Sequence, residues 1–104
     1  MADVADVPLQ TLVGKLRELA PALRAAGVKR LYIFGSRARG DARPDSDLDV
    51  LVETTSREET PRFDFFKVLR LIEDEVGLTT QISMRNLLKP RIAERIADDL
   101  VEVF

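Results

Sequence analysis

Two stretches of the sequence decide the fold: Leu31-Tyr32-Ile33-Phe34-Gly35-Ser36-Arg37-Ala38-Arg39-Gly40 and Asp45-Ser46-Asp47-Leu48-Asp49-Val50-Leu51-Val52. The apolar run 31–34 ends at a glycine, which is typical of a buried strand followed by a tight turn. Ser36 is a good N-cap, so residues 37–39 are expected to form a helical turn that Gly40 ends. The second stretch predicts another strand. The order is therefore strand, turn, short helix, loop and strand.

Side-chain alternation in the second strand separates two kinds of residue. Asp47 and Asp49 are two positions apart and leave on one face, whereas Leu48, Val50 and Val52 leave on the other and can enter a core. A helix start favours phosphate, because it presents backbone N–H groups and the positive end of the helix dipole. Mg²⁺ prefers oxygen ligands, usually one or two carboxylates with substrate phosphates. The pattern predicts a magnesium–nucleotide site with Asp47 and Asp49 as metal ligands.

The spacing Gly35-Ser36, ten residues, then Asp47-Leu48-Asp49 resembles the Gly-Ser-x10-Asp-x-Asp signature of nucleotidyltransferases with the polymerase-β-like palm fold. The longer string 35–40, with Ser46-Asp47-x-Asp49, is similar to the small bacterial minimal nucleotidyltransferases, which often serve as antitoxins to HEPN-domain toxins. The similarity extends over nearly the whole chain, to residues 90–92. It implies one domain, 1–104, that uses Mg²⁺ and ATP.

The same resemblance assigns roles to particular residues. Asp47 and Asp49 would be catalytic, and the nucleotide would be bound by Gly35, Ser36, Arg37 and Arg39. The arginines suit a triphosphate because guanidinium groups bind phosphate oxygens in pairs, although they could also belong to a solvated loop. Likewise, Ser36 could be a helix cap alone, and Asp45 to Asp47 could be turn residues.

Gln81 marks a departure from the family pattern. The family usually supplies a third carboxylate from a later strand, and the stretch 77–83 occupies that place here, with Gln81 at the acidic position. A glutamine carbonyl can bind a metal ion, but it carries no charge and cannot act as a base. In two-metal transfer the third carboxylate normally serves the ion that activates the attacking hydroxyl. Binding of Mg²⁺-ATP is expected to survive this change, with slow transfer.

Two functions remain open on these grounds. The leading interpretation is transfer of AMP from ATP to a protein hydroxyl, which in the antitoxin relatives is a tyrosine of the HEPN toxin. The alternative is a catalytically impaired antitoxin that neutralises its toxin by contact, which Gln81 favours. A scaffold without nucleotide binding would leave Gly35-Ser36 and the aspartate pair unexplained.

Composition excludes several other classes of protein. The chain has no Cys and no His, which removes disulfides, thiol nucleophiles, zinc thiolates and Ser-His-Asp catalysis. The net charge of −2 provides no overall basic field, so no direct binding of nucleic acid is expected. No apolar run reaches the length of a membrane span, and residues 1–7 lack a signal pattern, so no membrane partner and a cytoplasmic location are expected.

Hydrophobic periodicity predicts the remaining elements. We expect frayed residues 1–7, a helix over 8–26 divided at Pro21, a loop over 54–60, a strand over 78–83, a helix over 90–99 and an edge strand over 100–104. A further helix should start with Thr60 as cap and Pro61 in its first turn. Its buried stripe is expected to comprise Phe65, Phe66, Leu69, Ile72 and Val76. These elements predict an α+β fold, a small mixed sheet with helices packed on one face and a polar face free for substrate.

Overall fold

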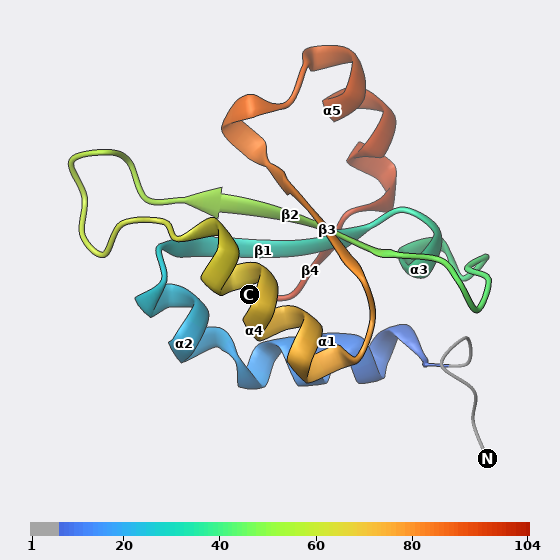
Figure 1. Cartoon of the computed structure of the whole chain (residues 1–104). Helices are drawn as coiled ribbons and strands as arrows, with labels where there is room; N and C mark the ends of the chain where they lie inside the picture. The colour runs from blue at the N-terminus through green and yellow to red at the C-terminus, as the bar shows by residue number, and fades with distance from the viewer. Residues whose placement is uncertain (1–6) are drawn as a thin grey trace.

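The computed structural model describes residues 7–104, so the expectation for residues 1–6 lies outside the described part. Within residues 7–104 the helical and strand elements follow one another in this order (Figure 1): α1 (Leu9–Glu18), α2 (Ala20–Ala25), β1 (Val28–Phe34), α3 (Ser36–Arg39), β2 (Leu48–Thr54), α4 (Phe65–Val76), β3 (Thr80–Met84), the 3₁₀ turn η2 (Arg85–Leu87), α5 (Pro90–Ile96), the 3₁₀ turn η3 (Ala97–Asp99) and β4 (Val101–Glu102).

The strands form one mixed sheet in the order β3-β2-β1-β4. β1 is antiparallel to both β2 and β4, while β2 and β3 are parallel. A parallel pair needs a long crossover connection, and α4 supplies it. The predicted α+β fold with a small mixed sheet is confirmed, and so is the short edge strand near the C-terminus.

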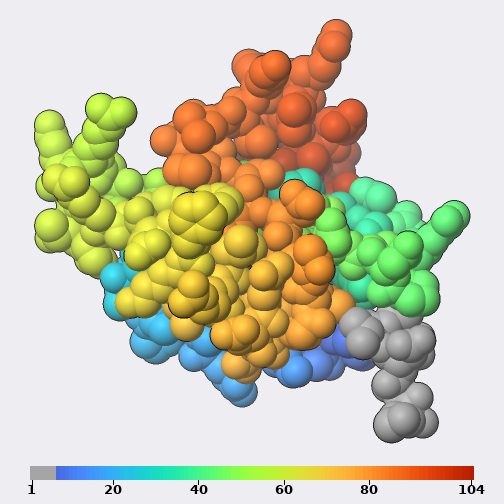
Figure 2. Space-filling model, in the orientation of Figure 1, coloured from blue at the N-terminus to red at the C-terminus, as the bar shows by residue number. Residues whose placement is uncertain are grey.

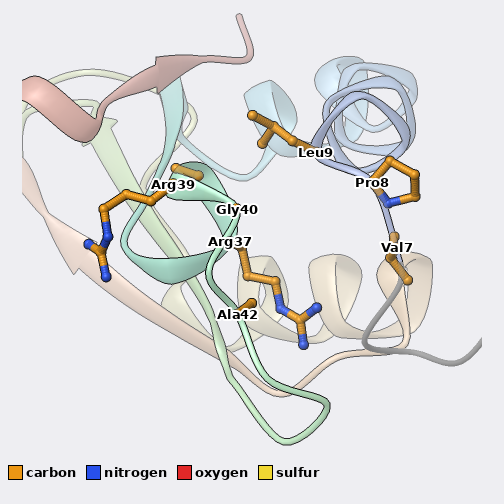
Figure 3. Close-up of a pocket in the computed structure, with 8 residues that line it drawn as sticks. Val7, Pro8, Leu9, Arg37, Arg39, Gly40 and Ala42 are labelled. Atoms are coloured by element: carbon orange, nitrogen blue, oxygen red, sulfur yellow. The ribbon is translucent and has the colours of Figure 1, made fainter.

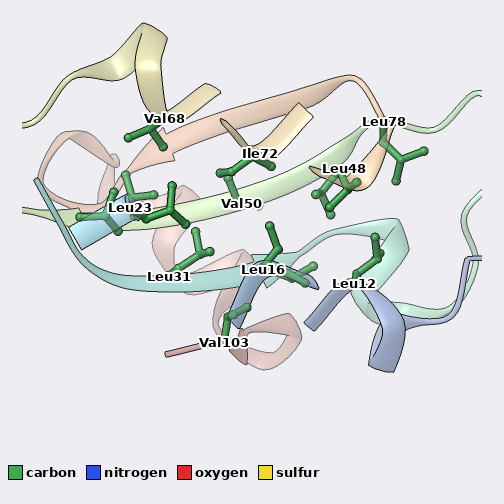
Figure 4. Close-up of a cluster of buried hydrophobic side chains, with 14 of the residues drawn as sticks. Leu12, Leu16, Leu23, Leu31, Leu48, Val50, Val68, Ile72, Leu78 and Val103 are labelled. Carbon is green, nitrogen blue, oxygen red and sulfur yellow. The ribbon is translucent and has the colours of Figure 1, made fainter. Parts of the chain in front are cut away.

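The apolar core lies between the sheet and the three helices α1, α2 and α4, which share one side of it (Figure 1). Leu48, Val50 and Val52 of β2 point into this core, as their alternation predicts, and all are fully buried. Figure 4 shows how side chains from α1, α2 and α4 meet those of β1 and β2. The polar positions of β2 therefore leave on the opposite face.

The first helical segment is divided, as Pro21 predicts. α1 ends at Glu18 and α2 begins at Ala20, with the proline in the first turn of α2, where the missing N–H costs no hydrogen bond. Val7, which we expected to be frayed, instead packs against the core.

The start of α4 differs from the prediction. The helix begins at Phe65, and the Asp64 side chain, rather than Thr60, caps it by accepting a hydrogen bond from the Lys67 backbone N–H at 3.2 Å. Phe65 and Phe66 consequently lie on the solvent side, with Phe66 74% exposed, and the buried stripe is Val68, Ile72 and Val76. The predicted burial of both phenylalanines is therefore wrong.

The C-terminal part of the chain crosses to the other side of the sheet. α5, drawn in orange-red, stands away from α1, α2 and α4 (Figure 1), and η2 and α5 form a projection on the space-filling surface (Figure 2). Ile96 at the end of α5 is buried, but outside the main core cluster. Among the described residues, no helix is both long and apolar enough to cross a bilayer.

Two leucines test the placement of the core. Leu16 in α1 is completely buried, whereas Leu87 in η2 is 71% exposed. Leu16→Ala should lower the free energy of unfolding by about 2–5 kcal/mol, because it removes buried methyl groups and leaves a cavity. Leu87→Ala, the matched control, should change it by less than about 0.5 kcal/mol. Urea denaturation of both variants measures this, and similar losses in the two would contradict the described packing.

Candidate active site

Three neighbouring strands place one residue each in a row across the polar face of the sheet. Phe34 of β1 pairs with Asp49 of β2 in the antiparallel ladder, and Asp49 pairs with Gln81 of β3 in the parallel ladder. Directly paired residues on neighbouring strands point to the same face. The structure therefore brings Gln81 beside the aspartates, as its position in the sequence predicts.

Asp47 joins this row from the residue just before β2. Its Oδ2 accepts a hydrogen bond of 3.1 Å from the Gln81 amide Nε2. Within residues 7–104, no set of three His, Cys, Asp or Glu side chains is close enough to hold a metal ion. The cluster thus consists of two carboxylates and one amide.

Gly35 lets the turn after β1 approach the Asp49 carboxylate. Its φ of +77° lies in the region that favours glycine, and a Cβ added there would lie 2.5 Å from Asp49 Oδ2. Any side chain at residue 35 would therefore have to displace the carboxylate. This contact fixes the distance between the turn and the acidic row.

The electrostatic environment of Asp49 is unfavourable to its charge. Partial burial raises the pKa of Asp49 above its ordinary value, and the neighbouring Asp47 charge raises it further, while Arg39 offsets part of this effect. A divalent cation between the two carboxylates would relieve both contributions. Asp47 and Asp49 could therefore hold such a cation together.

Ser36 lies beside this row without acting as a helix cap. The N-cap position of α3 is Gly35, and Ser36 is the first helical residue, so the predicted capping role is wrong. Its hydroxyl makes no hydrogen bond within the described chain, residues 7–104. Ser36 lines an open cavity of about 360 Å³ together with Phe34, Gly35, Arg39, Asp49, Arg95, Ile96 and Asp99.

Arg37 has its partners away from the acidic row. The side chain is only 4% exposed, and its terminal nitrogen donates to the backbone carbonyl oxygen of Ser46 at 2.7 Å and to that of Arg43 at 3.4 Å. Figure 3 shows it pointing to the opposite side of α3 from Arg39, beside a second cavity that contains neither aspartate. Arg37 therefore holds the loop before β2 in place.

That loop also has its own turn chemistry. The Ser46 hydroxyl accepts a hydrogen bond of 2.8 Å from the Arg43 backbone N–H, and the Ser46 N–H donates to the Arg43 carbonyl oxygen at 2.9 Å. The interpretation of Ser46 as a turn residue is confirmed. The loop therefore delivers Asp47 to the start of β2 with little freedom.

Arg39 lines the cavity that contains Ser36 and Asp49, but its guanidinium already forms ion pairs with carboxylates. It contacts Asp41 at 3.1 Å and Asp99, from η3, at 2.9 Å. These two carboxylates raise the pKa of Arg39. The structure thus separates the two arginines that sequence reasoning treated alike.

The cavity wall formed by α5 and η3 was not predicted. Arg95 and Asp99 lie more than forty residues beyond the end of β2 in the sequence, yet both line the cavity next to Ser36 and Asp49. No motif identifies them, because their position depends on how the C-terminal segment crosses the sheet. A signal that could have found Arg95 is its helical spacing, because it lies three residues after Ile92 and so shares one face of α5 with Ile92 and Ile96.

Comparison with known proteins identifies the family of the chain. The family described as "Nucleotidyltransferase domain" matches residues 10–103. The chain belongs to this family of nucleotidyltransferases. It is of the minimal type: a solved minimal nucleotidyltransferase is 31% identical, with a TM-score of 0.70, over 92% of this chain and 96% of the other.

Relatives of known name are of similar length. MJ0435 of Methanocaldococcus jannaschii is 33% identical over 84% of this chain and 91% of its own. Protein adenylyltransferase MntA of Thermococcus cleftensis is 36% identical over 74% of this chain and 76% of its own. A solved toxin–antitoxin complex with AMP-PNP contains a chain with the same fold, at a TM-score of 0.68 and 12% identity, over 88% of this chain and 72% of that one.

The contact between Gly35 and Asp49 can be tested with a matched pair of glycines. Gly35 and Gly40 both have positive φ, but a Cβ at Gly40 would meet nothing within 4 Å. Gly35→Ala and Gly40→Ala should each lose about 1–3 kcal/mol of stability from backbone strain. Only Gly35→Ala should also lose the thermal stabilisation given by Mg²⁺ and a nucleoside triphosphate, because it displaces Asp49. Equal stabilisation of both variants by ligand would contradict the proposed geometry.

The raised pKa of Asp49 predicts a pH-dependent stability. Because the folded protein holds this proton more tightly than the unfolded chain, the Asp49 charge destabilises the ligand-free protein at pH 7, and this cost disappears as pH falls through the raised pKa. Asp49→Asn should therefore melt at a higher temperature than wild type at pH 7 without metal, with a smaller difference near pH 4. Asp45→Asn, which removes an exposed charge nearby, is the control. A lower melting temperature for Asp49→Asn at pH 7 would contradict this account.

Proposed function

We propose that this protein binds Mg²⁺-ATP and transfers AMP to a hydroxyl group of a partner protein. The observation that carries the proposal is the row of Asp47, Asp49 and Gln81 lying against the turn at Gly35 and Ser36. The adenylyltransferase name of the Thermococcus relative supports the choice of AMP as the transferred group.

The donor set fits one magnesium ion held with substrate phosphates. Asp47 and Asp49 offer charged oxygen ligands, and Mg²⁺ commonly takes one or two carboxylates and completes its shell with phosphate oxygens and water. Burial raises the pKa of Asp49 and the Asp47 charge raises it further, and a bound cation would offset both effects. A bound Mg²⁺ would neutralise phosphate charge and help align the α-phosphate.

Transfer of AMP would require only ATP, the acceptor hydroxyl and water. The acceptor oxygen forms a bond to the α-phosphorus, the bond from that phosphorus to the bridging oxygen breaks, and pyrophosphate leaves with the bonding electrons. The Ser36 hydroxyl and the turn at Gly35 would orient the phosphates. The proton of the acceptor would pass to water, because Gln81 cannot accept it and both aspartates would be engaged in holding the metal ion.

The proposed partner is a toxin whose hydroxyl acceptor is a tyrosine. The fold shared with a chain of a solved toxin–antitoxin complex supports a toxin partner, and the resemblance to minimal nucleotidyltransferases supports a HEPN-domain toxin. The main apolar core and the helices α1, α2 and α4 share one side of the sheet (Figure 1). The paired residues Asp49 and Gln81 leave on the other face, so this core does not obstruct a protein acceptor.

Gln81 supports a second candidate function, neutralisation of a toxin by contact alone. Its amide nitrogen is directed at Asp47, so at this position the site holds a hydrogen-bond donor where the family places a carboxylate. An antitoxin with this change could still hold nucleotide and neutralise its toxin by contact alone. The two functions differ in whether neutralisation requires breakage of the α,β-phosphate bond.

The identity of residue 81 separates these functions. With a purified HEPN-domain toxin as acceptor and α-labelled ATP, Gln81→Asp should raise the single-turnover rate of AMP transfer about 10²–10⁴-fold, because the carboxylate can act as a general base. Gln81→Ala should not accelerate transfer. Melting temperatures should change little, because residue 81 is exposed.

Two outcomes would overturn parts of this account. Fast transfer by wild type with no gain in Gln81→Asp would show that residue 81 does not limit catalysis. Neutralisation of the toxin by wild type with an ATP analogue that has a methylene bridge between the α- and β-phosphates, without any transfer from ATP, would establish the contact function instead.

A further inference from the structure

Arg95 of α5 lines the same cavity as Ser36 and Asp49, and the proposed function gives it no role. Its charge, unlike that of Arg39, is not balanced by a neighbouring carboxylate: within residues 7–104 its guanidinium makes no ion pair and no hydrogen bond. We propose that Arg95 binds the β- and γ-phosphates of the nucleotide and the pyrophosphate that leaves with them. This inference rests on the proposed function.

The positions of the other arginines lead to this assignment. Arg37 donates to backbone carbonyl oxygens in the loop before β2, on the far side of α3. Arg39 faces the cavity, but Asp41 and Asp99 hold it by ion pairs of 3.1 and 2.9 Å. Of the two cations that line the cavity, Arg95 is therefore the one whose donors can turn to an entering ligand.

The balance of charge in the cavity also favours a phosphate-binding role for Arg95. The lining contains two carboxylates, Asp49 and Asp99, and two guanidinium groups, Arg39 and Arg95. Asp99 is matched by Arg39, and Asp49 would be matched by the metal ion. The outer phosphates of the nucleotide then add negative charge that only Arg95 remains to meet, and a planar guanidinium pairs well with two phosphate oxygens.

A structural role would have a different signature. Arg95 lies in the last turn of α5, where a cation can stabilise the negative end of the helix dipole. That role predicts a lower melting temperature for Arg95→Ala without ligand and no effect on nucleotide selectivity. A phosphate-binding role predicts the reverse.

The experiment compares Arg95→Ala and Arg95→Lys with Arg91→Ala, which removes a charge one turn earlier on α5 from a residue that does not line the cavity. Calorimetry measures the binding of Mg²⁺-ATP and of AMP to each protein. Arg95→Ala should bind Mg²⁺-ATP about fivefold to tenfold more weakly and AMP as wild type does, because AMP lacks the outer phosphates. Arg95→Lys should be intermediate, and Arg91→Ala should match wild type.

Each remaining outcome overturns a defined claim. Unchanged Mg²⁺-ATP affinity in Arg95→Ala, with binding by wild type intact, overturns this inference alone. Equal losses for Mg²⁺-ATP and AMP would place Arg95 at the base, ribose or α-phosphate, and an equal loss in Arg91→Ala would show a nonspecific effect of charge; either result overturns it. Absence of Mg²⁺-ATP binding in wild type would overturn the proposed function as well.

Discussion

The Asp49 carboxylate occupies the space that a side chain at residue 35 would fill. This contact exists because β1 and β2 pair in an antiparallel register that sets Phe34 opposite Asp49, so that the turn after β1 lies over the carboxylate. The parallel register of β2 and β3 then places Gln81 on the other side of Asp49. Two backbone ladders and one missing Cβ thus determine the relative positions of the turn, the carboxylates and the amide.

The sequence predicted this row well because strand alternation has a period of two and allows little ambiguity. Once Val50 and Val52 are assigned to the core, Asp49 must face the other way, and the same reasoning places Gln81. The helical stripe of α4 was less certain, because a run of apolar residues fits more than one helical offset. Asp64 caps the helix where Thr60 was expected to, which leaves Phe66 in solvent and gives Val68 to the core.

The roles of the arginines could not be read from the motif. Arg37 and Arg39 are two residues apart on a single turn of helix, so their side chains diverge, and their partners come from different parts of the chain. The loop carbonyl oxygen of Ser46 holds one, and Asp99 of η3 holds the other. A partner sixty residues away in the sequence depends on the path of the C-terminal segment, for which no local pattern provides information.

The two faces of the sheet differ in composition, because one is apolar and packed and the other carries the polar row. The main apolar core lies on the face toward α1, α2 and α4 (Figure 4). The paired residues Asp49 and Gln81 leave on the other face, with Asp47 beside them. Residue 81 is exposed, so it can change between an amide and an acid without any loss of apolar packing. In evolutionary terms, single substitutions on this face can change the chemistry that it offers to a ligand while the folding of the chain stays intact.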